Sequence, residues 1–199
     1  MTTVPDATWH HGRVDDFVFV SGRLCLDLAG TLLWRRSRRT ELLRSPDDLR
    51  RWILQAGLLD APGLLDARAL SRMCRLREAV YALVGAWPLT PPADSEVRDA
   101  LAEVNEMARL PLPRLQLDED GRLARTGGID EALGAVARDA VELLGGTDFP
   151  RVRECLNEDC TRLFVDLSRS ANRRWCGMSE CGNRHKVANY RKRRQGTAR

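Results

Sequence analysis

Four cysteines near the C-terminus carry the clearest chemical signal in this sequence. Cys155, Cys160, Cys176 and Cys181 follow the pattern C-x4-C-x15-C-x4-C. Two close pairs at a moderate separation suit a tetrahedral metal, because each pair forms a small knuckle and the chain between the pairs can fold back as a hairpin. Four thiolates favour zinc and leave it no open position for a water molecule. The pattern predicts a structural zinc site with these four ligands.

The alternative use of these cysteines is a pair of disulfides in a secreted domain. Residues 1–13 are polar and lack the apolar segment of a signal peptide, which disfavours secretion. No apolar run approaches the roughly 20 residues that cross a bilayer. We therefore expect a cytoplasmic protein with no membrane partner. Cys25 and Cys74 stand alone in apolar surroundings and are predicted to be buried core thiols.

Positive charge is concentrated in the segment that holds the four cysteines. From Arg151 onward the chain has 13 Lys and Arg against 5 Asp and Glu, a net charge of +8, whereas the preceding 150 residues have a net charge of −4. Zinc with four thiolates would lower the +8 by two. Such asymmetry predicts a polyanionic partner, most often nucleic acid.

The part of the chain before this segment has the pattern of a mainly helical domain. Ser45-Pro46-Asp47-Asp48 reads as a helix start, because serine can cap, proline is favoured at the first position and acids suit the positive end of the dipole. Apolar spacing predicts helices over residues 24–34, 45–57, 66–87, 97–108 and 130–144, the last capped by Asp130.

A few short strands complete the expected α+β fold. Residues 17–20 read as a strand, and residues 115–117 and 123–125 read as a hairpin around the polar turn 118–121. In the cysteine-rich part, residues 152–155 are expected to pair with 162–166, with the first knuckle between them. Cys181 is expected at the start of a basic helix, which is the layout of a treble-clef-like zinc module.

Basic side chains around the last two cysteines are the candidate nucleic-acid contacts. Asn183 and Arg184 have two readings, since they could read base edges or could cap the helix and brace the knuckle. The run 191–194 is expected to contact phosphates. The candidate contacts are Arg173, Arg174, Arg184, Lys186, Arg191, Lys192, Arg193 and Arg194.

A second basic cluster lies far from the cysteines, at Arg35, Arg36, Arg38 and Arg39. It could extend a nucleic-acid face or bind an acidic ligand. The other reading is a solvated face that is paired with acids of its own domain.

Residues 181–184, Cys-Gly-Asn-Arg, resemble the signature of the CGNR zinc finger, a bacterial C-terminal module usually joined to an ABATE domain in stress-induced transcription regulators. The similarity includes the other three cysteines and the approach Asn172–Cys176, and covers about the last fifty residues. Residues 22–27 and 49–58 resemble the ABATE opening more loosely, with Gly30-Thr31 where the family has Asn-Thr. The resemblance implies an ABATE-like domain over 1–146, a CGNR-type zinc finger over 151–199, and DNA binding by the zinc module.

The charge split and the resemblance together predict a DNA-binding transcription regulator. Its N-terminal domain would sense a small-molecule ligand or mediate assembly, such as a homodimer. The second hypothesis is a zinc adaptor that contacts RNA or another protein, because treble clefs serve these purposes too. We expect no enzymatic activity, since the sequence has no nucleophile-elbow, Walker or dinucleotide-binding motif.

Overall fold

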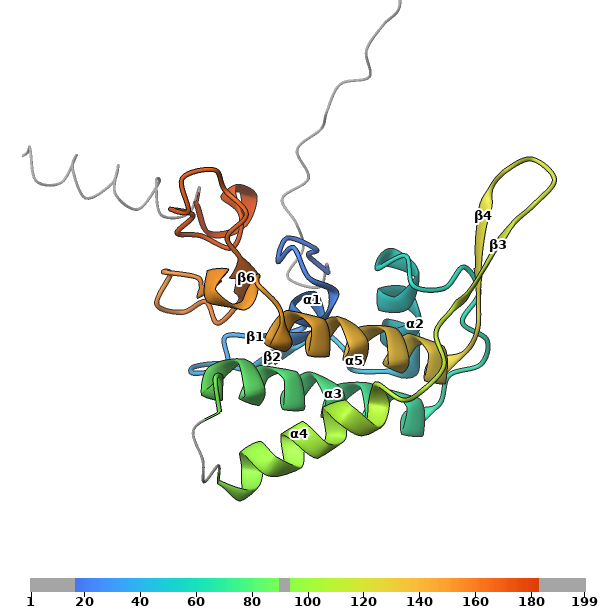
Figure 1. Cartoon of the computed structure of the whole chain (residues 1–199), viewed down its shortest axis with the longest axis horizontal. Helices are drawn as coiled ribbons and strands as arrows, with labels where there is room; N and C mark the ends of the chain where they lie inside the picture. The colour runs from blue at the N-terminus through green and yellow to red at the C-terminus, as the bar shows by residue number, and fades with distance from the viewer. Residues whose placement is uncertain (1–16, 90–93, 183–199) are drawn as a thin grey trace, which may run out of the picture.

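The computed structural model describes residues 17–89 and 94–182. Its helices are α1 (Leu24–Ala29), α2 (Pro46–Gln55), α3 (Ala67–Ala86), α4 (Ser95–Met107) and α5 (Ile129–Gly145), with single turns η1 (Phe149–Arg151) and η2 (Met178–Gly182). Three antiparallel pairs accompany them: β1 (Leu32–Leu33) with β2 (Thr40–Glu41), β3 (Arg114–Leu117) with β4 (Leu123–Thr126), and β5 (Val152–Glu154) with β6 (Leu163–Val165) (Figure 1). The predicted mainly helical α+β fold with short strands is confirmed.

Local capping chemistry starts the helices where the sequence indicates. The Ser45 hydroxyl accepts the Asp48 N–H at 3.2 Å, with Pro46 opening α2. Asp66 caps α3 in the same way, by accepting the Ala69 N–H at 2.7 Å. The predicted cap of α5 was wrong. Gly128 occupies that position and donates its N–H to the Glu131 carboxylate at 2.7 Å, while Asp130 lies in the first turn.

The region before α2 differs from the prediction. Residues 17–20 form no strand, because the Asp27 carboxylate accepts the Val20 and Ser21 N–H groups at 3.1 and 3.0 Å and so satisfies donors that a strand would use. The first helix ends at Ala29 rather than continuing to residue 34, and the chain turns into the short β1–β2 pair.

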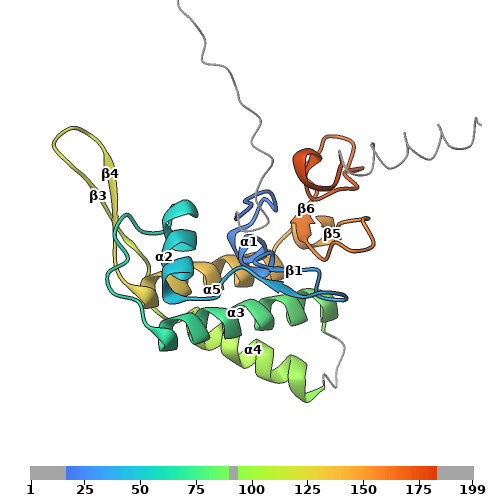
Figure 2. The ribbon, with the colours of Figure 1, turned by 180° about the vertical axis from the view of Figure 1, so that it is seen from behind.

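The main core lies where α1, α3 and α5 meet, with α4 packed on α3 and α5 (Figures 1 and 2). Cys25 is fully buried there, as predicted, and burial raises the pKa of its thiol. Cys74 is only partly buried. In the described part of the chain, no helix is both long and apolar enough to cross a membrane.

Strand β6 joins the main core to the cysteine-rich segment. Successive side chains of a strand point to opposite faces. Leu163 and Val165 belong to the main core, whereas Phe164, fully buried, packs against the four cysteines together with Trp175. One strand therefore contributes to two hydrophobic clusters, and the cysteine-rich module is seated on the helical domain.

Candidate zinc centre

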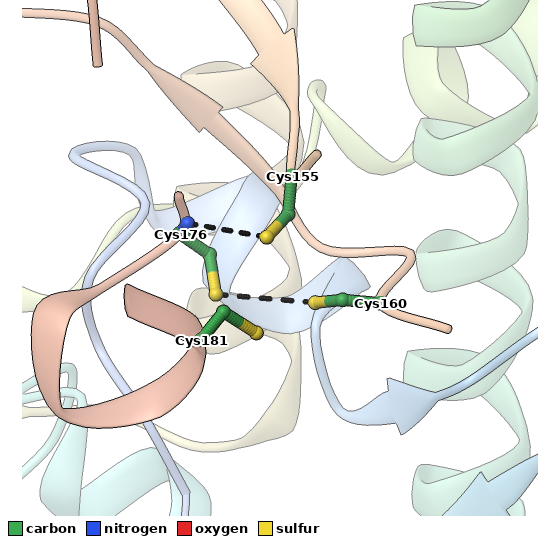
Figure 3. A group of neighbouring side chains, drawn as sticks. All are labelled: Cys155, Cys160, Cys176 and Cys181. Atoms are coloured by element: carbon green, nitrogen blue, oxygen red, sulfur yellow. Dashed lines mark hydrogen bonds between the residues drawn. The ribbon is translucent and has the colours of Figure 1, made fainter. Parts of the chain in front are cut away.

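The four cysteine side chains converge on one point (Figure 3). Their Sγ atoms all lie within 4.8 Å of one another, and each of the four residues is buried. The Cys160 and Cys176 sulfurs are 3.9 Å apart, whereas a disulfide requires about 2.05 Å. A tetrahedron of thiolates at about 2.3 Å from a zinc ion has sulfurs about 3.8 Å apart. The observed separation fits a shared zinc ion.

Two knuckles hold the pairs. Cys155 follows β5, and its N–H donates to the Arg162 carbonyl at 3.0 Å, so the β5–β6 ladder continues up to the first ligand. The Cys160 N–H donates to the Asn157 carbonyl at 2.7 Å and closes the first knuckle. The second knuckle is the turn η2, in which the Cys181 N–H donates to the Gly177 carbonyl at 3.1 Å. The predicted pairing of residues 152–155 with 162–166 is confirmed.

The surroundings of the sulfurs suit thiolates. The Cys176 N–H lies 3.4 Å from the Cys155 sulfur, and Asn157 Nδ2 lies 3.5 Å from the Cys181 sulfur. Without a metal, hydrogen bonds from its three neighbours lower the pKa of Cys155, whereas hydrogen bonding to Cys155 raises the pKa of Cys176. Zinc binds the deprotonated sulfur, so its binding releases the protons of the thiols.

Asp166 organises the loop that leads to the second pair. Its buried carboxylate accepts the Ser168 hydroxyl at 2.5 Å, the Ser168 N–H at 2.9 Å and the Arg173 N–H at 2.9 Å. The hydrogen bond from the Ser168 hydroxyl, with those from the two backbone groups, lowers the pKa of Asp166. The carboxylate is therefore held in its charged form and fixes the shape of residues 166–173.

Arg173 connects this loop to the rest of the protein. Its guanidinium donates to the carbonyls of Trp175 at 3.0 Å, Val20 at 2.8 Å and Cys176, and lies 4.3 Å from the centre of the Phe164 ring. One side chain thus anchors the backbone at a zinc ligand to the start of the helical domain. These contacts occupy donors that a nucleic-acid contact would need.

Arg173→Ala is expected to weaken zinc binding about 10- to 100-fold without removing a ligand, the range for partners that orient metal ligands. Competition against a chromogenic zinc chelator measures the change. Arg169→Ala is the matched control, because Arg169 is an exposed arginine of the same loop. Equal zinc affinity in the Arg173 variant and the wild type would remove the anchoring role.

The remaining predicted nucleic-acid contacts divide into two groups. Arg174 is exposed, and its carbonyl accepts the Leu156 N–H at 3.0 Å, so its backbone is tied to the first knuckle. The helix predicted after the last cysteine lies outside the described residues. So do the other predicted contacts, which are Arg184, Lys186, Arg191, Lys192, Arg193 and Arg194.

The second basic cluster, residues 35–39, makes contacts with the zinc module. The Arg35 N–H donates to the buried Thr161 hydroxyl at 3.1 Å, and its guanidinium binds Glu78 at 2.5 Å. Arg36 binds Glu154 of β5 at 2.5 Å. Arg35 is thus paired with an acid of its own domain, as one reading of the cluster predicted, whereas Arg36 pairs across to the zinc module. Thr161 carries no signal in the sequence, because its partner Arg35 lies 126 positions away. The partners of Asp166 are local, two and seven positions on, so its role in the loop is of the kind that an Asp-x-Ser turn signal can indicate.

A cavity of about 450 Å³ opens beside α1 in the helical domain. Two acids lie on it: Asp27, whose pKa is raised by burial, and Asp139, which binds Arg23 at 2.9 Å. Its lining residues are Phe19, Gly22, Arg23, Leu24, Asp27, Gln55, Ala56 and Asp139.

Comparison with known families covers both parts of the chain. The family model for ABATE, described as "Putative stress-induced transcription regulator", matches residues 22–147, more than half of the chain. The model for the CGNR zinc finger matches residues 151–194, which include all four cysteines. A search of curated proteins finds no match. The chain therefore belongs to the ABATE family and carries a CGNR zinc finger, with zinc as its cofactor.

Proposed function

We propose that this protein is a cytoplasmic DNA-binding transcription regulator, in which the zinc module docks on DNA and the ABATE domain senses a ligand or mediates assembly. The observation that carries the proposal is the net charge from Arg151 onward, which is +8 from Lys, Arg, Asp and Glu and about +6 once zinc and four thiolates are included, in a module whose four cysteines form one metal site. Phosphate neutralisation by arginine and lysine supplies sequence-independent affinity for DNA. A domain with net charge −4 beside it gives the protein one face that attracts DNA.

The arrangement of the module supports this docking. A knuckle, a hairpin and a last ligand that precedes a predicted basic helix make up the treble-clef layout, with the helix as the element that would meet DNA. Within the described residues, Arg174 stands exposed two positions before Cys176, on a backbone fixed to the first knuckle. Because this backbone is already fixed, binding of a phosphate has to order the arginine side chain but no loop.

The cavity beside α1 is the candidate site for the sensed ligand. Both Asp139 oxygens are bonded, to Arg23 and to the Cys25 N–H. Asp27 uses Oδ1 for the Val20 and Ser21 N–H groups, so its Oδ2 is the candidate acceptor for a ligand with amine or hydroxyl donors. The cavity wall includes Gly22 and Arg23, next to the Val20 carbonyl that Arg173 binds. A ligand bound there could therefore change the contact between Arg173 and the Val20 carbonyl, which joins the zinc module to the helical domain.

One observation favours the second candidate function, an adaptor that binds protein. Leu156, Leu167 and Met178 of the zinc module are 55, 58 and 51% exposed. Exposed apolar side chains on a small module suit a protein partner. Tight capture of a protein that survives nuclease treatment, together with the absence of DNA binding, would place this function first.

Arg174→Glu is expected to weaken binding to duplex DNA about tenfold or more, because it replaces one phosphate contact with a repulsion. Fluorescence anisotropy with a labelled duplex measures the affinity. The matched control is Arg109→Glu, the same charge change at an exposed arginine of the ABATE domain, with less than about a twofold expected effect. Equal losses in both variants would argue against docking through the zinc module.

A further inference from the structure

The hairpin of β3 and β4 extends away from the helical body as an arm (Figures 1 and 2). All four residues of β3 are exposed. A two-stranded hairpin is at best marginally stable in water, and three or more strands with an apolar face are needed for independent stability. The arm is therefore a structure that further pairing would stabilise.

One face of the arm carries three leucines. The register pairs Leu117 with Leu123 and Leu115 with Arg125, so the three leucines share this face with Arg125, which lies at the base of the arm. Their exposed fractions are 66% for Leu115, 68% for Leu117 and 43% for Leu123. Leucines that point at one another across strands and remain exposed mark an interaction surface.

The outer edge of β3 is open within the described residues, and the hydrogen-bond pattern shows which groups it offers. The tip closes with Asp118 N–H to the Arg122 carbonyl and Gly121 N–H to the Asp118 carbonyl, both at 3.0 Å. Alternation along the ladder then directs the N–H and C=O of Leu115 and Leu117 away from β4.

The opposite edge of the arm confirms this assignment. Arg125 lies across from Leu115, and its N–H and C=O also point out of the ladder, where both bond to Asp60 at 2.6 and 3.0 Å. The β4 edge is thus occupied near its base by the protein itself. The β3 edge, with two leucines, offers the same kind of backbone groups to a partner.

We propose that a second copy of this chain occupies that edge, with β3 of each copy pairing antiparallel about a two-fold axis at Gln116. In this register Leu115 of one copy faces Leu117 of the other, so the outward backbone groups of both strands bond to each other. Six leucines then lie on one face of a four-stranded sheet, with Leu115 and Leu117 of both copies at its centre and Arg125 of each copy on the outer strands. Such an interface uses the same patch on both copies, as closed two-fold dimers do.

Charge complementarity selects this register and this partner. With the axis at Gln116, Arg114 of each copy stands opposite Asp118 of the other, on the face away from the leucines. Opposite charges directly across a strand pair stabilise the pairing. Arg114 begins β3 and Asp118 directly follows its last residue. Gln116 lies midway between them, so the two charges meet when two copies pair about that residue.

The proposal is tested by sedimentation of the zinc-loaded full chain. The wild type is expected to be a concentration-dependent dimer, and Leu117→Lys is expected to raise the dimer dissociation constant at least about tenfold, because each interface loses two leucines. Leu64→Lys is the matched control, since Leu64 is a fully exposed leucine outside the arm. A wild type that stays monomeric at all concentrations, or a Leu117→Lys variant that dimerises normally, would overturn the proposal.

Cross-linking tests the register. Gln116→Cys brings two thiols face to face at the axis, at about 4.5–5.5 Å between Cα atoms, so oxidised glutathione should convert the variant to a covalent dimer on a non-reducing gel. Ala124→Cys is the control, because it lies on the same face one strand farther from the axis in each copy, beyond disulfide reach. The wild type gives the background of the native cysteines. Equal cross-linking of the two variants, or none of the Gln116 variant above background, would refute the two-fold pairing of β3.

Discussion

Cys176→Ser is expected to abolish stoichiometric zinc binding and to unfold the zinc module. Zinc affinity should fall by more than about 100-fold, the upper end of the effect of losing a partner that only orients a ligand. The hydrophobic cluster around the site consists of Phe164, Trp175 and the cysteines themselves. So small a cluster cannot fold without the metal, and the binding energy of zinc is part of its folding energy.

The same substitution should also destabilise the ABATE domain without unfolding it. Leu163 and Val165 leave the main core when β6 is released, and burying each contributes about 1.5–3 kcal/mol. We therefore expect the helical circular-dichroism signal to persist while the urea midpoint of the domain falls. Zinc content by atomic emission gives the first readout. Cys74→Ser, which removes a cysteine that is not part of the cluster, should keep one zinc per chain. Full zinc retention by Cys176→Ser, or complete loss of helical signal, would contradict the account.

Glu41→Gln is expected to lower the free energy of unfolding by about 2–3 kcal/mol, less than most of the roughly 3–5 kcal/mol for breaking a fully buried ion pair, because Glu41 is one third exposed. Its carboxylate oxygens bind Arg77 at 2.6 and 2.7 Å, and Arg77 is 4% exposed. Glu41 raises the pKa of Arg77 against the opposing effect of burial. Glutamine at this position keeps one acceptor oxygen but loses the negative charge and the second acceptor, so the buried guanidinium keeps Glu78 as its charged partner and Thr31 as a neutral one.

Two further variants isolate the cause of that loss. Replacing both Glu41 and Arg77 with methionine should recover most of the stability, because no uncompensated charge remains. Glu103→Gln, which breaks the surface pair with Arg75 at 3.3 Å, should change stability by less than about 1 kcal/mol. Urea denaturation followed by circular dichroism measures all three. Similar values for Glu41→Gln and Glu103→Gln would show that burial of Arg77 carries no penalty.

The sequence predicted those features whose physics is local. Ser45 and Pro46 start α2 through one hydrogen bond and one fixed dihedral angle. A stretch of three or four residues is therefore enough to predict where this helix begins. The metal site is predictable for the same reason. Within each close pair, Cys155 with Cys160 and Cys176 with Cys181, the four intervening residues set the distance between two ligands, which is a local property.

The features that the sequence did not predict depend on distant partners. Residues 17–20 have strand-forming side chains, yet Asp27 binds the backbone donors at their end. Arg173 reads as one more basic residue beside the cysteines, and its use as an anchor depends on the Val20 carbonyl, 153 positions away. Arg35 and Arg36 have the same character, since Glu78 and Glu154 meet them only in the folded chain.

Binding of DNA by the zinc module should depend strongly on salt. To measure this, the zinc-loaded protein is titrated by fluorescence anisotropy against random duplex DNA and RNA of equal length across a salt series. A zinc module that docks on DNA should prefer the duplex and give a slope of log K against log salt of about −0.9 for each phosphate contacted. Binding that is absent, or that does not depend on salt, would contradict this docking and leave the adaptor as the better description of this protein.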